Sequence, residues 1–406
     1  MNKSASIALI ITALDAIGIG LIMPVLPTLL REYVANETLA NHYGILLALY
    51  AVMQVIFAPI LGKWSDKFGR RPVLLLSLIG ATLDYTLLAL SSSLWMLYLG
   101  RTIAGITGAT GAVAASIIAD ATTVKDRTTW FGRLGAAFGV GLIAGPAIGG
   151  FAGQYSPHLP FLIAAILNIC VFVAVFIFFK GKKINLDLEQ QNIHDTNESS
   201  PIKTPFSTLI KPIILLLFIF FIAQLIGQIP ATIWVLFTES RFQWNSIEVG
   251  LSLAGLGIMH ALFQAFIAGF LTRKFNEKIT IIIGFISDGI AFILLSLITQ
   301  GWMIYPTLIL LAGGGIALPA LQGLVSTQVN QGSQGKLQGI LVSLTNLTGI
   351  IGPLLFSFIF GKTLALWDGW LWLIGSILYV GLIIIYALYS KNTVKTQRQW
   401  LINQTH

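Results

Sequence analysis

The chain has 406 residues, of which 56% are hydrophobic and only 10% charged, and its mean hydropathy is +0.84. Soluble domains carry roughly a quarter charged residues, so this composition excludes a soluble enzyme of the same length. It indicates instead an all-α or barrel protein that crosses a membrane several times.

Twelve apolar runs are long enough to cross a bilayer as helices, which takes about 20 residues each. They are continuous rather than alternating, so they predict helices and not the strands of an outer-membrane barrel. The first run carries Asp15 in its middle and is too long for a signal peptide, so we expect it to be retained. The predicted spans are 5–29, 43–62, 72–91, 94–119, 129–153, 159–179, 211–237, 247–271, 278–299, 302–327, 337–361 and 367–390.

The positive charges predict the orientation of these spans. Twenty of the 24 Lys and Arg residues fall at the N-terminus or in loops on its side of the membrane. The opposite loops hold only Arg31, Arg241 and Lys362, and Arg101 lies within a span. Both termini are therefore predicted to face the cytoplasm, and the net charge of +8 reflects topology rather than a nucleic-acid partner.

A long polar stretch divides the chain into two halves. It contains few apolar residues and three prolines near its end, so we interpret it as a flexible linker. The alternative, a small folded domain, would have only ~30 residues with which to build a core. The predicted organisation is an N-terminal six-helix bundle (1–180), a cytoplasmic linker (181–210) and a C-terminal six-helix bundle with a short cytoplasmic tail (211–406).

The two halves repeat one another at an offset of 207 residues. Residues 58–71 (APILGKWSDKFGRR) align with residues 265–278 (AFIAGFLTRKFNEK), and Gly145-Pro146 aligns with Gly352-Pro353 at the same offset. Such a repeat predicts two pseudo-symmetric bundles related by an axis along the membrane normal, with a substrate site between them at mid-depth.

Charged side chains inside the spans are the first candidate site residues, because each costs roughly 2.5–3.5 kcal/mol to insert. Asp15, Asp84 and Asp288 lie near the middle of the first, third and ninth spans, and Arg101 lies in the fourth. Each acid could be structural, and Asp84 with Arg101 is the obvious ion pair. A carboxyl group away from water can also hold a proton and release it when a cation arrives. We assign that role to Asp288.

Histidine and glutamine residues in the spans could have either a functional or a structural role. His260 could share in a proton relay, although a structural hydrogen bond is the commoner role of a lone intramembrane histidine. Gln54 and Gln264, in the second and eighth spans, could bind a substrate or tie helices together.

The loop between the second and third spans combines glycines with opposite charges. An acid flanked by glycines indicates a latch against another helix end, beyond what a basic cytoplasmic loop requires. Asp120, at the end of the fourth span, is the candidate partner of Arg70 or Arg71. The predicted motif comprises Gly62, Ser65, Asp66, Gly69, Arg70, Arg71 and Asp120.

The fifth span carries glycines at a spacing of four residues together with a proline. Gly141, Gly145 and Gly149 form a smooth face for helix contact, Gly150 adjoins it, and Pro146 predicts a kink. Tight packing alone would explain the glycines, whereas the proline adds a possible pivot or seal.

These motifs resemble those of the major facilitator superfamily. The segment Gly62 to Arg71 is similar to that family's loop 2–3 motif, and GLIAGPAIGG (141–150) to the fifth-helix motif of its drug/proton antiporters. The fourth-helix motif is partial, because Ala104 stands where a glutamine is usual. The resemblance implies the major facilitator fold and a transporter. No arrangement typical of an enzyme site or of an ATP-binding loop is present in the sequence.

Longer stretches resemble the tetracycline/proton antiporters of Gram-negative bacteria. They include LDAIGIGLIMPVLPTLLREYVA (14–35), GRTIAGITGATGAVAASIIAD (100–120) and LILLAGGGIALPALQG (308–323). The resemblance implies export across the inner membrane of a tetracycline chelated to Mg²⁺ or a similar divalent cation, in exchange for H⁺, and hence tetracycline resistance. It implies no permanent cofactor, no metal ligands on the protein and a monomer as sufficient. The residues that it implicates are Asp15, Asp84, Asp288, Asp66, Arg70, Gln54, Arg101, Asp120 and His260.

Two alternatives remain open from the sequence. An importer and an exporter share this scaffold, and helix periodicity does not separate them. The transported species could also be another small organic solute coupled to protons.

Overall fold

The computed structural model describes residues 3–179, 213–330 and 333–404. Within these ranges the chain is helical and contains no strand, which confirms the all-α class. It forms two compact units, one of residues 1–202 with 243–257 and the other of residues 203–242 with 258–406. The predicted linker, residues 181–210, lies outside the described residues.

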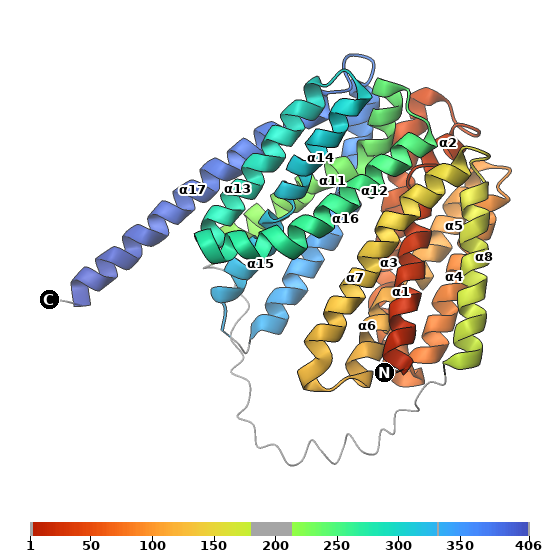
Figure 1. Cartoon of the computed structure of the whole chain (residues 1–406), viewed down its shortest axis with the longest axis horizontal. Coiled ribbons are helices and arrows are strands. Elements are labelled where there is room, and N and C mark those ends of the chain that lie inside the picture. The colour runs from red at the N-terminus through yellow and green to blue at the C-terminus, as the bar shows by residue number, and fades with distance from the viewer. Residues whose placement is uncertain (1–2, 180–212, 331–332, 405–406) are drawn as a thin grey trace, which may run out of the picture. The chain divides into compact units, whose positions relative to one another are not determined.

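The first unit begins at the N-terminus, and its helices follow the predicted spans closely (Figure 1). The fourth span is built from two shorter helices that are separated at Gly108 and Ala109. In chain order the helices are α1 (Lys3–Ile22), α2 (Leu26–Leu30), α3 (Asn36–Phe68), α4 (Arg70–Ala89), α5 (Leu94–Thr107), α6 (Thr110–Ala121), α7 (Val124–Gly153) and α8 (Leu159–Phe178).

The remaining elements continue from α11 (Ile214–Phe242) and α12 (Ser246–Leu262), whose first part belongs to the first unit. The tenth span is again built from two helices, separated at Gly315 and Ile316. The elements that follow α12 are η1 (Phe263–Ala268), α13 (Gly269–Leu297), η2 (Gly301–Met303), α14 (Ile304–Gly314), α15 (Ala317–Thr327), α16 (Gln334–Thr363) and α17 (Trp370–Gln404).

The described residues contain eleven helical stretches long and apolar enough to cross a membrane. The longest, Ser246–Leu297, has 52 residues and would measure about 78 Å if straight, more than twice a bilayer core. It is divided at a kink by a non-helical residue, Asn276. Figure 1 shows the ribbon of α12 and α13 folding back on itself within this stretch. Counted as two, it brings the described spans to the twelve predicted.

The internal repeat has structural counterparts at the same offset of 207 residues. Gly69 (φ +93°) ends α3, and Asn276 (φ +65°) interrupts the helix at the equivalent place. Both are residue types that tolerate a positive φ. The interruptions of the fourth and tenth spans, at Gly108 and Gly315, are equivalent in the same way.

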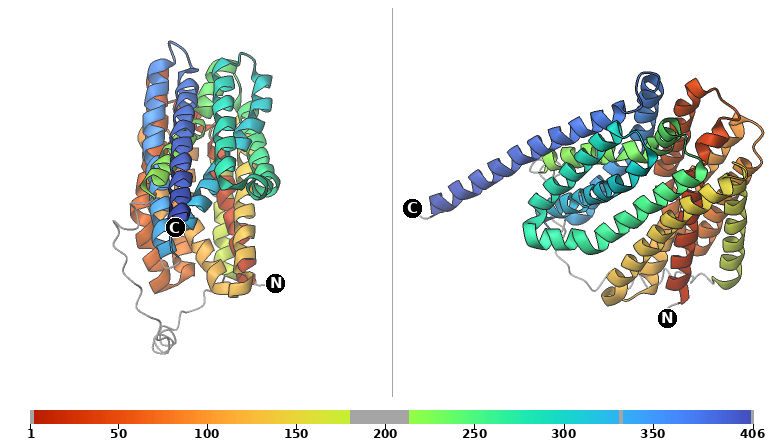
Figure 2. Two further views of the ribbon diagram at one scale, coloured as in Figure 1. Left: turned by 90° about the vertical axis from the view of Figure 1, so that its left-hand side faces the viewer. Right: turned by 45° about the horizontal axis from the view of Figure 1, so that its top comes forward.

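The last membrane span, Trp370–Ser390, ends where the sequence predicts. The helix α17 continues beyond this span to Gln404, so the residues that follow the span are also helical. With 35 residues it extends past the other helices of its unit (Figure 1 and Figure 2).

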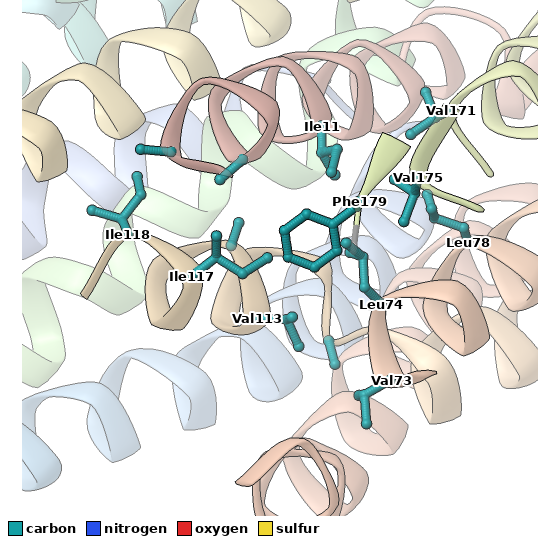
Figure 3. Close-up of a cluster of buried hydrophobic side chains, with 14 of the residues drawn as sticks. Ile11, Val73, Leu74, Leu78, Val113, Ile117, Ile118, Val171, Val175 and Phe179 are labelled. Atoms are coloured by element: carbon teal, nitrogen blue, oxygen red, sulfur yellow. The ribbon is translucent and has the colours of Figure 1, made fainter. Parts of the chain in front are cut away.

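An apolar cluster joins α1, α3, α4, α6 and α8 in the first unit (Figure 3). Phe179, directly after α8, lies among aliphatic side chains of the other helices, including Leu74 and Val113. Because the cluster lies near the α4 end that carries Arg70, it helps to fix that end against α6 and its Asp120. Its buried members are Ala5, Ala8, Ile11, Leu61, Val73, Leu74, Leu78, Ala109, Val113, Ala114, Ile117, Ile118, Val171, Val175 and Phe179.

Candidate functional site

Asp288 lies in the second unit, near the middle of α13, with an uncharged partner. Tyr379 of α17 donates its hydroxyl to Asp288 Oδ2 at 2.9 Å. A Cβ atom at Gly314, the last residue of α14, would collide with the Asp288 carboxyl group, so the glycine makes room for it. Asp288 takes part in none of the ion pairs of the described residues. This carboxyl group is therefore free to exchange a proton without breaking an ion pair.

His260 of α12 contacts the residue next to Gly314. A Cβ atom at Gly315 would come within 2.9 Å of His260 Cε1, and the imidazole is hydrogen bonded to the carbonyl of Leu311. His260 and Asp288 thus contact consecutive glycines at the interruption of the tenth span, although no hydrogen bond joins them in the described structure. The hydrogen bond to the backbone agrees with a structural role for His260. Its participation in a proton relay stays a prediction.

Asp15 occupies the comparable setting in the first unit. It is half-buried in α1 and hydrogen bonded to Thr110, the first residue of α6. Like Asp288, it belongs to none of the ion pairs of the described chain. Both acids therefore lie beside the interruption of a divided span and have a hydroxyl group as their partner.

Asp84 and Arg101 form the ion pair that the sequence suggested. Arg101 Nε lies 3.1 Å from Asp84 Oδ1, and Arg101 Nη2 pairs with Asp84 Oδ2, a bidentate arrangement. The two residues are 1% and 8% exposed. The guanidinium also lies over the ring of Tyr50, 5.8 Å from its centroid. Since the pair neutralises both charges within the span, its geometry favours a structural role for Asp84.

Gln54 and Gln264 each donate to a backbone carbonyl within their own unit. Gln54 Nε2 lies 3.4 Å from the Gly108 carbonyl oxygen and 3.2 Å from the Tyr50 hydroxyl. Gln264 Nε2 lies 3.1 Å from the carbonyl oxygen of Gly315. Both contacts tie helices together, which was one of the two readings left open by the sequence.

The loop motif forms a charged cluster at the junction of α3 and α4. Arg70 pairs with Asp66, and its Nε donates to Asp120 Oδ2 at 3.0 Å, the partner that the sequence suggested. Its Nη1 also donates to the buried hydroxyl of Ser65 at 3.2 Å. Gly69 supplies the positive φ that lets α4 begin after a single residue between it and α3. One guanidinium therefore joins the ends of α3, α4 and α6.

The other members of the loop motif have different surroundings. Arg71 Nη2 donates to the carbonyl of Phe176 in α8 at 2.5 Å, and its guanidinium lies 5.4 Å from the centre of the Phe176 ring. Arg71 does not contact Asp120. Glycine at position 62 would permit a close approach of another helix, but a Cβ atom there would meet no atom within 4 Å in the described structure.

The glycines of α7 pack directly on the backbone of α1. A Cβ atom at Gly145 would lie 2.7 Å from Gly20 Cα and from the Ile17 carbonyl oxygen. Gly141 and Gly149 meet the backbone of α1 in the same way, one turn before and one turn after. The predicted smooth face is therefore the contact between α7 and α1.

The last glycine of this motif faces a different helix. A Cβ atom at Gly150 would collide with the Ser246 carbonyl at the start of α12, and one at Gly250 would collide with the Pro146 carbonyl. These close approaches place residues 243–257 with the first unit. The helix α7 continues through Pro146, so a pivot there stays a prediction.

Three functional neighbours were missed by the sequence argument, namely Thr110, Tyr50 and Tyr379. Each presents a hydroxyl group to a candidate residue. The sequence signal for all three is a hydroxyl side chain at the depth of an intramembrane acid or amide, which the pattern of charges and amides alone does not reveal. No group of three His, Cys, Asp or Glu side chains in the described ranges could hold a metal ion.

Comparison with known proteins places this geometry in a family. The family model of the Major Facilitator Superfamily matches residues 8–257 and 216–403. The chain is 68% identical to the tetracycline resistance protein, class D, of Salmonella ordonez, over 96% of this chain and 98% of that protein. It is 62% identical to the class B protein of Escherichia coli, over 95% of each chain.

A solved structure shares the fold at much lower identity. A bacterial homologue of the human lysosomal transporter Spinster superimposes with a TM-score of 0.74 at 16% identity, over 96% of this chain and 97% of that one. This likeness shows the fold. The family match and the curated relatives define a multi-pass membrane transporter rather than an enzyme. The chain belongs to the major facilitator superfamily and, within it, to the family of the tetracycline resistance proteins.

Proposed function

We propose that this chain exports a tetracycline chelated to a divalent cation, normally Mg²⁺, in exchange for H⁺, and so confers tetracycline resistance. The observation that carries the proposal is the 68% identity to a tetracycline resistance protein along nearly the whole chain. The cation arrives with the drug, so the protein needs no bound metal of its own, and one chain suffices for the cycle.

Asp288 is the principal proton site in this proposal. Its partner is the Tyr379 hydroxyl rather than a cation, so binding or losing a proton breaks no ion pair. Removing a lone negative charge from a span by protonation lowers the cost of keeping the acid there. Asp15, hydrogen bonded to Thr110, is the second proton site, and Asp84 with Arg101 holds the fold around it.

The charge of the substrate supplies the exchange step. A chelate with one net positive charge approaches from the cytoplasm and displaces the proton from Asp288 by electrostatic attraction to the carboxylate. On the periplasmic side a proton rebinds and the chelate leaves. One positive charge moves in each direction, so the exchange transfers no net charge.

The cluster around Arg70 acts as a cytoplasmic latch. Arg70 forms ion pairs with Asp66 and Asp120. In this proposal these ion pairs form and break as the ends of α3, α4 and α6 move. Surface ion pairs contribute only ~0–1 kcal/mol each, which suits contacts that must open in every cycle. In this proposal the protein lies in the bacterial inner membrane with both termini in the cytoplasm, in agreement with its positive-inside loops.

The test is drug accumulation in cells that do or do not express the chain, at two external pH values. Expressing cells should hold less tetracycline, and the difference should grow as the external medium becomes more acidic. In everted vesicles, a chelator of divalent cations should stop uptake and added Mg²⁺ should restore it. Uptake that ignores the chelator would overturn the chelate as substrate. Proton-coupled flux of another solute without tetracycline export would favour the alternative function.

A further inference from the structure

The fourth and tenth spans are each interrupted near the middle, and a glutamine from a neighbouring helix reaches each interruption. Gln54 of α3 donates to the Gly108 carbonyl between α5 and α6, at 3.4 Å. Gln264 of η1 donates to the Gly315 carbonyl between α14 and α15, at 3.1 Å. Each contact lies within one unit, so the two units show the same arrangement independently.

The carbonyl group at each interruption lacks its usual backbone donor. In an α-helix the Gly315 carbonyl would accept from residue 319, but Pro319 has no N–H group. At Gly108 the chain turns, and the first backbone bond of the next helix runs from Val113 N to the Ala109 carbonyl. No backbone amide of the described residues donates to Gly108 oxygen. A carbonyl inside a membrane span needs a donor, and each glutamine supplies one.

The two glutamines reach equivalent carbonyls from non-equivalent positions. The offset of 207 residues matches Gly108 with Gly315, but it matches Gln54 with Ala261 rather than with Gln264. Gln264 lies one turn further along, in a π-helical segment, whereas Gln54 lies in a regular α-helix. Segments of π-helix shift the register of a helix and occur often at functional sites. Both units therefore contain a contact between a glutamine amide and the interrupting glycine carbonyl, although the two glutamines are not equivalent in the repeat.

Both interruptions also touch the proposed proton sites. In the second unit, Asp288 packs on Gly314 and His260 on Gly315, while Ser287 donates to the Leu310 carbonyl at 2.7 Å. In the first unit, Thr110, the first residue after the interruption, is hydrogen bonded to Asp15. A change in the geometry of either interruption would therefore move the immediate surroundings of a proton site.

We infer that Gln54 and Gln264 are positioning residues. Each side-chain amide replaces a hydrogen-bond donor that the backbone lacks, and so holds the interrupted span in the geometry in which Asp15 or Asp288 contacts it. The link to transport rests on the proposed function, whereas the donor role does not. The inference assigns both amides to the protein's own backbone and not to the drug.

A double-mutant cycle at the tenth span tests the donor role. Gln264→Met keeps the size of the side chain but cannot donate, and Pro319→Ala restores a backbone N–H four residues after Gly315. In the native background, Gln264→Met should raise hydrogen–deuterium exchange over residues 315–327 and slow tetracycline transport about tenfold, with little change in drug affinity. In the P319A background, the same substitution should change exchange and transport by no more than about twofold.

Three outcomes would overturn the inference. One is a loss of drug affinity on Gln264→Met that is equal in both backgrounds, because a residue that binds drug is not rescued by a backbone donor. Another is unchanged exchange over residues 315–327. The third is Gln264→Asn, one methylene shorter, behaving like the native protein. The Asn variant also serves if the Met variant fails to insert.

A matched control separates this effect from the general loss of an amide in a span. Gln224 of α11 donates to the Thr345 hydroxyl at 2.8 Å, away from either interruption. Gln224→Met should leave exchange over 315–327 and over 108–121 unchanged, whereas Gln54→Met should raise it over 108–121. Because exchange is measured on drug-free protein, it decides the inference even if the native chain proves not to transport tetracycline.

Discussion

Two carboxylates of the spans differ in what neutralises them. Asp84 is paired with Arg101 in a buried bidentate contact, whereas Asp288 accepts a hydrogen bond from Tyr379 and has no cationic partner among the described ion pairs. A paired acid that lost its charge would leave a buried guanidinium uncompensated. An unpaired acid carries no such cost. The partner, not the depth in the membrane, therefore separates a structural acid from one that can carry protons.

The first prediction concerns Asp288. Asp288→Asn should reduce uphill tetracycline uptake in everted vesicles to the level of vesicles without the protein, because an amide cannot take up and release the coupling proton. The variant should still insert, since it removes an uncompensated charge from the span. Uptake driven by a pH gradient is measured, together with the amount of protein in the membrane.

Tyr379→Phe is the matched control for that variant. It removes the hydroxyl donor but keeps the carboxyl group, so coupled transport should persist at a reduced rate. Native, proton-coupled uptake by Asp288→Asn would contradict the assignment of the proton to this residue.

The second prediction concerns the buried pair. Asp84→Asn leaves Arg101 without its carboxylate and should lower the free energy of unfolding by about 3–5 kcal/mol. Asp84→Asn combined with Arg101→Gln should cost less than the single change, because no unpaired charge remains. Thermal unfolding in detergent micelles measures both variants. A double variant less stable than the single one would show that the pair contributes more than mutual neutralisation.

At the scale of helices, the packing of α7 on α1 depends on glycines, which have no side chain. Its three glycines spaced by four residues meet backbone atoms of α1, not flexible side-chain tips, so nothing nearby can move aside cheaply. Without a strong hydrophobic effect between helices in lipid, such close backbone packing is a main source of helix association. A single methyl group at this contact is therefore expected to matter.

The third prediction compares two glycines of α7. Gly145→Ala should lower the free energy of unfolding by about 1–3 kcal/mol, because its Cβ would lie 2.7 Å from backbone atoms of α1. Gly135→Ala meets no atom within 4 Å and should be neutral or stabilise the helix by up to ~1 kcal/mol. Unfolding temperatures of the two variants give the comparison. Equal temperatures would argue against the contact between α7 and α1.

For the whole molecule, the sequence predicts those features that depend on the residue types within one segment of the chain. Runs of apolar residues gave the twelve spans, and single acids in them gave Asp15, Asp84 and Asp288 as candidates. The repeat at 207 residues also matches Gly69, where α3 ends, with Asn276, where the helix is interrupted. The contacts of Gln264 and Tyr379 were not predictable in this way, because they depend on the rotation of neighbouring helices and on a π-helical shift of register.

The last prediction concerns the driving force of the complete cycle. If a chelate with one positive charge is exchanged for one proton, no net charge crosses the membrane, so the pH gradient alone drives accumulation. In everted vesicles, collapse of the membrane potential with valinomycin and K⁺ should leave the accumulation ratio unchanged, whereas collapse of the pH gradient with nigericin should abolish it.

If the exchange did carry net charge, the effect of the membrane potential on the accumulation ratio would be large enough to measure. One net charge moved through 100 mV corresponds to about 2.3 kcal/mol, roughly a 50-fold change in the accumulation ratio. A strong response to valinomycin would show that the exchange carries net charge, through a second proton or an uncharged substrate. If the net charge comes from a second proton, a second acid must bind it in each cycle, and Asp15 is the carboxyl group whose setting beside an interrupted span matches that of Asp288.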